Sequence, residues 1–204
     1  MHKFIRSKAP VNFTRVEQKY QRWDRELINS EEHTIIGNAL YEQQDHYCAY
    51  CEIKIEEMQG GGHIEHLERR SDNPQRTFDW NNMFFSCNNL DSCGKFKDNQ
   101  RLKYDVKDIV DPSREDPADF FTFDALGNVS PLNHSVEHRA LETIRIFNLQ
   151  DSVRLKRKRA EIAETVKYFL ESSPSEDDIT EFLTSLTGQD YISVYYNMLN
   201  RRMA

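Results

Sequence analysis

The sequence predicts a small α+β centre with helices on both sides. Apolar residues show helical spacing over residues 13–45, and the pattern returns from residue 135 onwards. Between these stretches, residues 46–98 hold all four cysteines and the motif HIEH, which is typical of a short strand. The chain of 204 residues is therefore expected to divide into segments 1–45, 46–110, 111–134 and 135–204.

Local signals place the elements outside the centre. Asn29 and Ser30 are expected to divide residues 13–45 into two helices. The run FFTFDALGNVSP alternates and carries a Gly-Asn pair, which predicts a short hairpin in an otherwise extended segment. Asp151 or Ser152 is the expected N-cap of a long helix, and Ser175 is expected to open another.

The formal net charge of −7 disfavours a free-standing, high-affinity DNA binder. Any nucleic-acid activity then needs a local basic surface or a partner that holds the substrate. The run RLKRKR, residues 154–159, is the one dense basic stretch. It either follows a phosphate backbone or forms a solvated helix face or a patch for an acidic partner.

Localisation is expected to be cytoplasmic, without a membrane partner. Apolar runs stay well short of the roughly eighteen residues that span a bilayer. The N-terminus MHKFIRSKAPVNF lacks the apolar centre and cleavage site of a signal peptide.

The cysteines are clustered in one 46-residue window, at positions 48, 51, 87 and 93. In a reducing cytosol this clustering favours a metal site over disulfides, whereas ordinary buried cysteines would be scattered. Cys48 and Cys51 have the spacing of a zinc knuckle, and Cys87 and Cys93 are more widely spaced. Four thiolates would complete a tetrahedral shell, which predicts a structural Zn²⁺.

The HIEH motif lies inside this cysteine frame. In a strand, Glu65 shares one face with His63, and Ile64 shares the other with His66. The carboxylate can hold a hard divalent cation while the imidazole takes a proton from water. Taken alone, however, the four residues favour an ordinary polar surface strand.

The wider pattern resembles the HNH nucleases. It combines a Glu-His strand, an asparagine five residues before a cysteine and a flanking four-cysteine frame. The resemblance implies a ββα-metal fold, in which two strands and a helix beginning near Cys93 hold one catalytic divalent cation, Mg²⁺ or similar. It implies that His66 is the general base, that Glu65 is a metal ligand and that Asn82 orders the loop and the base. The implied reaction is phosphodiester hydrolysis.

This chain departs from the HNH pattern at Gly94, where the family has His or Asn as a second metal ligand. Asn88, Asp98 and Asn99 are candidates for that role, and Lys95 and Lys97 are candidates for phosphate contacts. The role of His63 is open between a supporting group, a substrate contact and a plain polar strand residue.

A longer resemblance is to the PtuB family, the HNH component of Septu anti-phage defence. It is carried by MHKFIRSKAP, HIEHLERRSDNP, DWNNMFFSCNN, CGKFKDN and DPSREDPADFFTFDALGNV, and covers most of residues 1–170. It implies a DNA substrate and a PtuA-like ATPase partner of the ABC/SMC type, joined in some systems by a retron reverse transcriptase and its RNA–DNA. The rival interpretations are an RNA-cleaving defence effector, for example one cutting tRNA, and a non-catalytic zinc adaptor.

The C-terminal helices are the expected docking region for the ATPase. They carry few residues of catalytic type, but Tyr191, Tyr195 and Tyr196 form an aromatic stripe. Such a stripe is common at protein contacts and more common in plain core packing. We expect the partner to contact part of residues 135–204.

Overall fold

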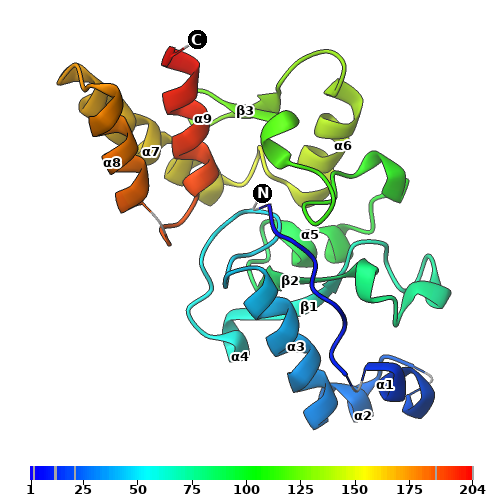
Figure 1. The fold of residues 1–204 in the computed structure, drawn as a ribbon. Coiled ribbons are helices and arrows are strands. Elements are labelled where there is room, and N and C mark those ends of the chain that lie inside the picture. Colours follow the sequence, from blue (N-terminus) through cyan, green and yellow to red (C-terminus); the bar gives the residue numbers. More distant parts are fainter. Residues whose placement is uncertain (2, 12, 21, 187, 204) are drawn as a thin grey trace.

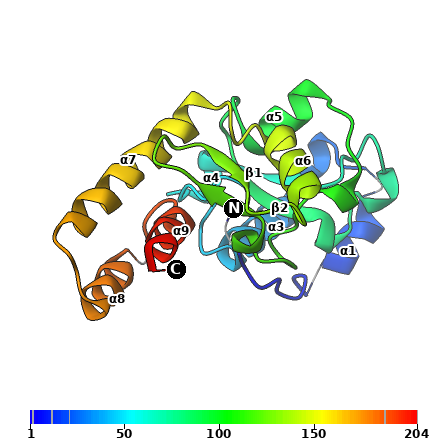
Figure 2. The same cartoon turned by 90° about the horizontal axis from the view of Figure 1, so that it is seen from above.

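The structure is a computed structural model that describes residues 1, 3–11, 13–20, 22–186 and 188–203. Over these ranges the chain forms nine α-helices and two separate two-stranded antiparallel sheets (Figures 1 and 2). The prediction of an α+β protein is confirmed. Within the described part of the chain, helices long and apolar enough to cross a membrane are absent.

The N-terminal segment contains three short helices where the sequence predicted two. They are α1 (Phe13–Lys19), α2 (Arg25–Ile28) and α3 (Glu31–Gln43). Ser30 caps α3 by accepting a hydrogen bond from the backbone N–H of His33. The additional break arises because Asp24 caps α2 in the same way, accepting from Glu26 and Leu27.

The central unit is a strand–strand–helix arrangement. After an irregular turn labelled α4 (Met58–Gly61), β1 (Gly62–His66) pairs antiparallel with β2 (Met83–Cys87). Helix α5 (Cys93–Gln100) follows and packs on β2 (Figure 1). The strand at HIEH and the helix beginning at Cys93 are both confirmed. All five residues of β2 are buried, so this strand anchors the unit in the core.

The second sheet is the predicted hairpin, β3 (Phe121–Phe123) paired with β4 (Val129–Pro131). Gly127 turns the chain there with φ +76°, and a Cβ at this position would lie 2.1 Å from the carbonyl oxygen of Lys156. Only glycine fits this turn. Strand β4 contacts α6 (Glu137–Phe147), so the hairpin is packed structure rather than a linker.

The remaining C-terminal helices are α7 (Val153–Glu171), α8 (Glu176–Ser185) and α9 (Ile192–Met203). As predicted, Ser152 caps α7, and Ser175 forms a capping box with Asp178 at the start of α8. Figure 1 shows α7, α8 and α9 grouped at the end of the molecule away from α1 and α2.

The C-terminal helices share the core of the central unit. Phe147 of α6 stacks on Tyr50 with ring centroids 3.8 Å apart, and both rings are fully buried. Further along the chain, the backbone N–H of Tyr191 donates to the carbonyl of Glu52, and the N–H of Lys54 donates to Asp190. Removing residues 135–204 would therefore uncover the core, so partner docking is better tested by surface substitutions than by truncation.

Candidate metal centre and adjoining polar site

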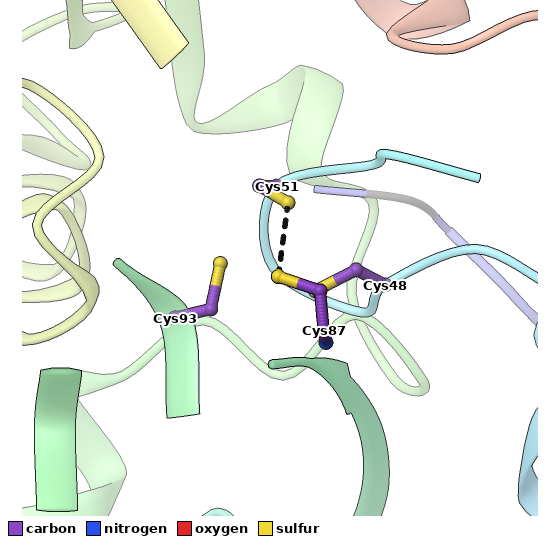
Figure 3. Close-up of side chains that lie close together, drawn as sticks. All are labelled: Cys48, Cys51, Cys87 and Cys93. Carbon is purple, nitrogen blue, oxygen red and sulfur yellow. Dashed lines mark hydrogen bonds between the residues drawn. The ribbon is translucent and has the colours of Figure 1, made fainter. Parts of the chain in front are cut away.

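The four cysteines come together in one buried cluster. Their sulfur atoms all lie within 4.8 Å of one another, and none of the four is in a disulfide (Figure 3). The sulfurs of Cys51 and Cys87 are 3.8 Å apart. A regular tetrahedron with metal–sulfur bonds of about 2.3 Å has edges of about 3.8 Å. The cluster has the donor set and the spacing to hold a structural metal ion.

Three elements deliver these sulfurs. Cys48 and Cys51 lie in a tight turn that is closed by a hydrogen bond from the N–H of Cys48 to the carbonyl of Ile53. Cys87 ends β2, and Cys93 begins α5. The backbone N–H of Cys87 donates to the sulfur of Cys48 at 3.4 Å, which supports a thiolate at that position. The cysteine cluster therefore joins the turn, the hairpin and the helix.

Glu65 is buried beside this cluster, with one carboxylate oxygen occupied and the other unpaired. Its Oε1 accepts a hydrogen bond from the Tyr50 hydroxyl at 3.2 Å and lies 3.2 Å from the ammonium of Lys97. Its Oε2 is shielded from solvent and has no hydrogen-bond partner among the described residues. Burial raises the pKa of Glu65 to about 7, against the opposing charge of Lys97.

His66, the next residue, is held in one tautomer. Its Nε2 donates to the carbonyl of Thr77 at 2.9 Å, so Nδ1 carries the lone pair of the neutral ring. The ring stands edge-on to Trp23, with centroids 4.8 Å apart. Burial lowers the pKa of His66 to about 4, and the nearby charges of Arg70 and Lys97 act in the same direction. The ring is therefore neutral at pH 7 and able to accept a proton.

Asn82 holds the loop that positions His66. Its side-chain oxygen accepts from the N–H of Glu68 at 2.8 Å, and its amide donates to the carbonyls of Glu68 and Arg76. Arg76 precedes Thr77, whose carbonyl accepts the hydrogen bond from Nε2 of His66. Asn82 thus connects both ends of the loop between β1 and β2.

Replacing Asn82 with alanine should destabilise the fold by about 2–4 kcal/mol, because several buried backbone groups would lose their partners together. Urea unfolding measures this change. Asn81 is the matched control, since it is adjacent and exposed, and its replacement with alanine should change stability by less than about 0.5 kcal/mol. Equal stability of the two variants would contradict the loop-holding role of Asn82.

His63 lies on the same face of β1 as Glu65. Its Nδ1 is 3.1 Å from the side-chain oxygen of Asn88, and the amide of Asn88 donates to the carbonyls of Gly60 and Gly62. A Cβ on Gly94 would lie 2.3 Å from Cγ of Glu65 and 3.1 Å from Nε2 of His63. Gly94 therefore lets α5 approach both side chains.

The other candidates lie on or near α5. Lys97 is fully buried, where its ammonium donates to the carbonyl of His66 and to Asp98 as well as meeting Glu65. It holds the Glu65 side chain, and its burial leaves it poorly placed for a phosphate. Asp98 is half-exposed and also lies 3.4 Å from Arg69. Lys95 is half-buried and close enough to His63 to contribute to the lowering of its pKa, while Asn99 is exposed.

The basic run of α7 does not form a single basic stripe. Arg159 is buried and donates to the carbonyls of Gly127 and Leu149. Arg154 lies near the cysteine cluster, where it donates to the hydroxyl of Ser92. Only the middle residues, 156–158, are exposed. Of the tyrosine stripe, Tyr191 is buried in the core, Tyr195 is half-buried and Tyr196 is exposed.

Three residues of the site were not expected from sequence. Tyr50 binds Glu65, Trp23 packs on His66, and Thr77 fixes the His66 tautomer. The position of Tyr50 between Cys48 and Cys51 was a usable signal, since any residue there lies beside the cysteine cluster. Trp23 and Thr77 meet His66 only through tertiary folding, and Thr77 acts through a backbone carbonyl that its side chain does not reveal.

Comparison of the sequence with protein-family models and with curated proteins finds no match. The function is therefore inferred from the site and from the motifs in the chain.

Proposed function

We propose that this protein is a metal-dependent HNH endonuclease that hydrolyses phosphodiester bonds in DNA. The main observation behind this proposal is that Glu65 and His66 are adjacent. Glu65 keeps one buried carboxylate oxygen unpaired, and Thr77 fixes the neutral tautomer of His66. The pair lies on a strand–strand–helix unit beside a four-cysteine cluster. The HNH motif resemblance and this arrangement support the same interpretation.

His66 is the proposed general base. A hydrogen bond from its Nε2 to Thr77 leaves Nδ1 to accept a proton from the attacking water. Packing against Trp23 keeps the ring from rotating away. Since burial keeps the pKa of His66 near 4, the free base is present throughout the neutral range.

Glu65 is the proposed ligand of a catalytic divalent cation. Tyr50 and Lys97 hold one oxygen in place, which directs the unpaired Oε2 to a cation. Such a cation, when bound, polarises the phosphate and stabilises the leaving oxyanion. Lys95, half-buried at the start of α5, is the remaining candidate for a phosphate contact. The cysteine cluster would hold a separate, structural Zn²⁺, because four thiolates leave no open coordination position.

Substrate delivery is the proposed task of a partner. The net charge of −7 and the interrupted basic run give the chain little intrinsic attraction for a phosphate backbone. On the basis of the PtuB resemblance, we therefore propose that this protein is an anti-phage effector. It would be controlled by a PtuA-like ATPase and, in some systems, by a retron with its RNA–DNA. Weak affinity on its own would keep such a nuclease inactive until DNA is delivered.

A cleavage assay on duplex DNA, single-stranded DNA and RNA tests this proposal. The full chain is assayed with and without the ATPase, in Mg²⁺, in Mn²⁺ and in a chelator. We expect cleavage of DNA that requires the divalent cation and increases with the partner. Preferential cleavage of RNA would favour the RNA-cleaving effector. Binding without cleavage of any substrate would favour the zinc adaptor.

The partner is proposed to dock on the exposed surface of the C-terminal helices. Tyr168 on α7 is 80% exposed, which makes it the most accessible large aromatic side chain there. Tyr168→Asp should weaken co-purification with the ATPase at least ~10-fold and leave the melting temperature unchanged. Val11→Asp, at a fully exposed apolar residue near α1, is the control. If only Val11→Asp weakens the complex, the partner docks on the N-terminal side instead.

A further inference from the structure

Two solvent-shielded ligand atoms belong to side chains that both lie against the start of α5. Oε2 of Glu65 and Nε2 of His63 are both shielded from solvent, and neither has a hydrogen-bond partner among the described residues. They are consequently not bonded to each other. Leaving two such polar atoms unpaired is costly, and a native structure usually satisfies them with water or an ion.

The position of Gly94 shows that the side chains of Glu65 and His63 are neighbours. A Cβ built on this glycine would lie 3.1 Å from Nε2 of His63 and 3.2 Å from Cδ of Glu65. Both groups therefore surround one point at the start of α5. A side chain at residue 94 would compete with them for this space. The glycine that removes the usual helix ligand also allows the two strand residues to approach the helix.

The tautomer of His63 suits metal binding. The amide nitrogen of Asn88 donates to the carbonyls of Gly60 and Gly62, which leaves its oxygen to accept a hydrogen bond from Nδ1 of His63. Nε2 of His63 then carries the lone pair. A hydrogen bond from the second ring nitrogen is the usual support of a metal-binding histidine. Asn88 is thus a positioning residue for His63.

We infer that His63 and Glu65 together bind the catalytic cation, with His63 replacing the ligand that is missing at Gly94, and that the site prefers a first-row transition metal to Mg²⁺. This inference rests on the proposed function. The preference follows from the donor set, because imidazole nitrogen suits transition metals, whereas Mg²⁺ favours oxygen ligands and retains its water. Among the described residues around Glu65, His63 offers a solvent-shielded donor atom without a hydrogen-bond partner, whereas Asn88 binds His63, Asp98 binds Lys97 and Asn99 is exposed.

Mn²⁺ binding tests the inference without relying on activity. The zinc-loaded full chain is titrated with Mn²⁺, and free Mn²⁺ is counted by its EPR signal, with Mg²⁺ as competitor. Mn²⁺ does not displace Zn²⁺ from thiolates, so the cysteine cluster does not contribute to the measured Mn²⁺ binding. We expect one Mn²⁺ site that Mg²⁺ displaces only in large excess.

Substitutions at and around His63 test its assignment as a metal ligand. His63→Ala and Gly94→Ala should each weaken Mn²⁺ binding by at least about 100-fold, and Asn88→Ala by about 10- to 100-fold. All three should retain zinc. His138→Ala is the matched control, because it removes another imidazole paired with a carboxylate, Asp108, on the surface. Its Mn²⁺ affinity should equal that of the wild type.

The results that would contradict this inference differ from those that would contradict the proposed function. If Glu65→Gln loses Mn²⁺ but His63→Ala binds it as the wild type does, the ligand assignment of His63 is wrong and the proposed function stands. If the wild type binds no Mn²⁺, or Glu65→Gln binds it unchanged, both the inference and the proposed metal-dependent mechanism are wrong. Displacement by equimolar Mg²⁺ would overturn the predicted metal preference.

Discussion

Cys48→Ser is expected to remove the structural zinc and most of the stability of the fold. Cys48 is fully buried and its sulfur accepts a hydrogen bond from Cys87, so the change removes one of the four expected zinc ligands at a buried position. Binding of structural zinc contributes about 10–16 kcal/mol in zinc-finger peptides, comparable to the whole stability of a typical domain. The cluster joins the turn, β2 and α5, and its loss should loosen all three.

Metal analysis and thermal unfolding measure this effect. The wild type should carry about one zinc ion per chain, and each of the four cysteine-to-serine variants should lose it with a similar fall in melting temperature. Ser86→Ala is the control, because Ser86 is buried 3.8 Å from the sulfur of Cys48 without being a ligand. A wild type that purifies without zinc and melts like the Cys48→Ser variant would contradict the structural-metal proposal.

His66→Ala is expected to reduce cleavage by about 100- to 10,000-fold, the usual contribution of a general base. The zinc content should not change, because His66 is outside the cysteine cluster. Some stability should be lost, since the ring packs on Trp23 and binds the Thr77 carbonyl.

His33→Ala is the matched control for this loss of packing. His33 also stands edge-on to Trp23, at 5.6 Å between ring centroids. It should show a comparable stability change with normal cleavage. Full cleavage by His66→Ala, or an equal loss of cleavage in both variants, would remove His66 from the role of general base.

The parts of the site that adjoin one another in sequence could be predicted. The cysteine pairs and the HIEH strand are encoded by local spacing, and the helix at Cys93 was implied by the motif resemblance. The structure places all three as expected. The capping residues Ser30, Ser152 and Ser175 were predictable for the same reason, because a cap acts within one turn of its own helix.

The parts that depend on burial could not be predicted. Lys97 and Tyr191 have sequence surroundings typical of exposed residues, yet Lys97 is buried on Glu65 and Tyr191 is buried beside Arg154. Gly94 was an unexplained departure from a motif until α5 was placed against β1. The glycine is explained by the short distance between the helix backbone and nearby side chains, and the spacing of residues in a sequence does not encode that distance.

The most direct test of the proposed mechanism is DNA cleavage by the zinc-loaded Glu65→Gln variant compared with the wild type, across a titration of Mn²⁺. The substitution keeps the size of the side chain and its contact with Tyr50 but removes the charge that would bind the cation. We expect cation-dependent cleavage by the wild type, and a loss of at least ~100-fold in the variant with zinc retained. Equal cleavage by the two proteins, or cleavage by the wild type in a chelator that leaves the zinc in place, would contradict a mechanism that depends on Glu65 and a second metal ion.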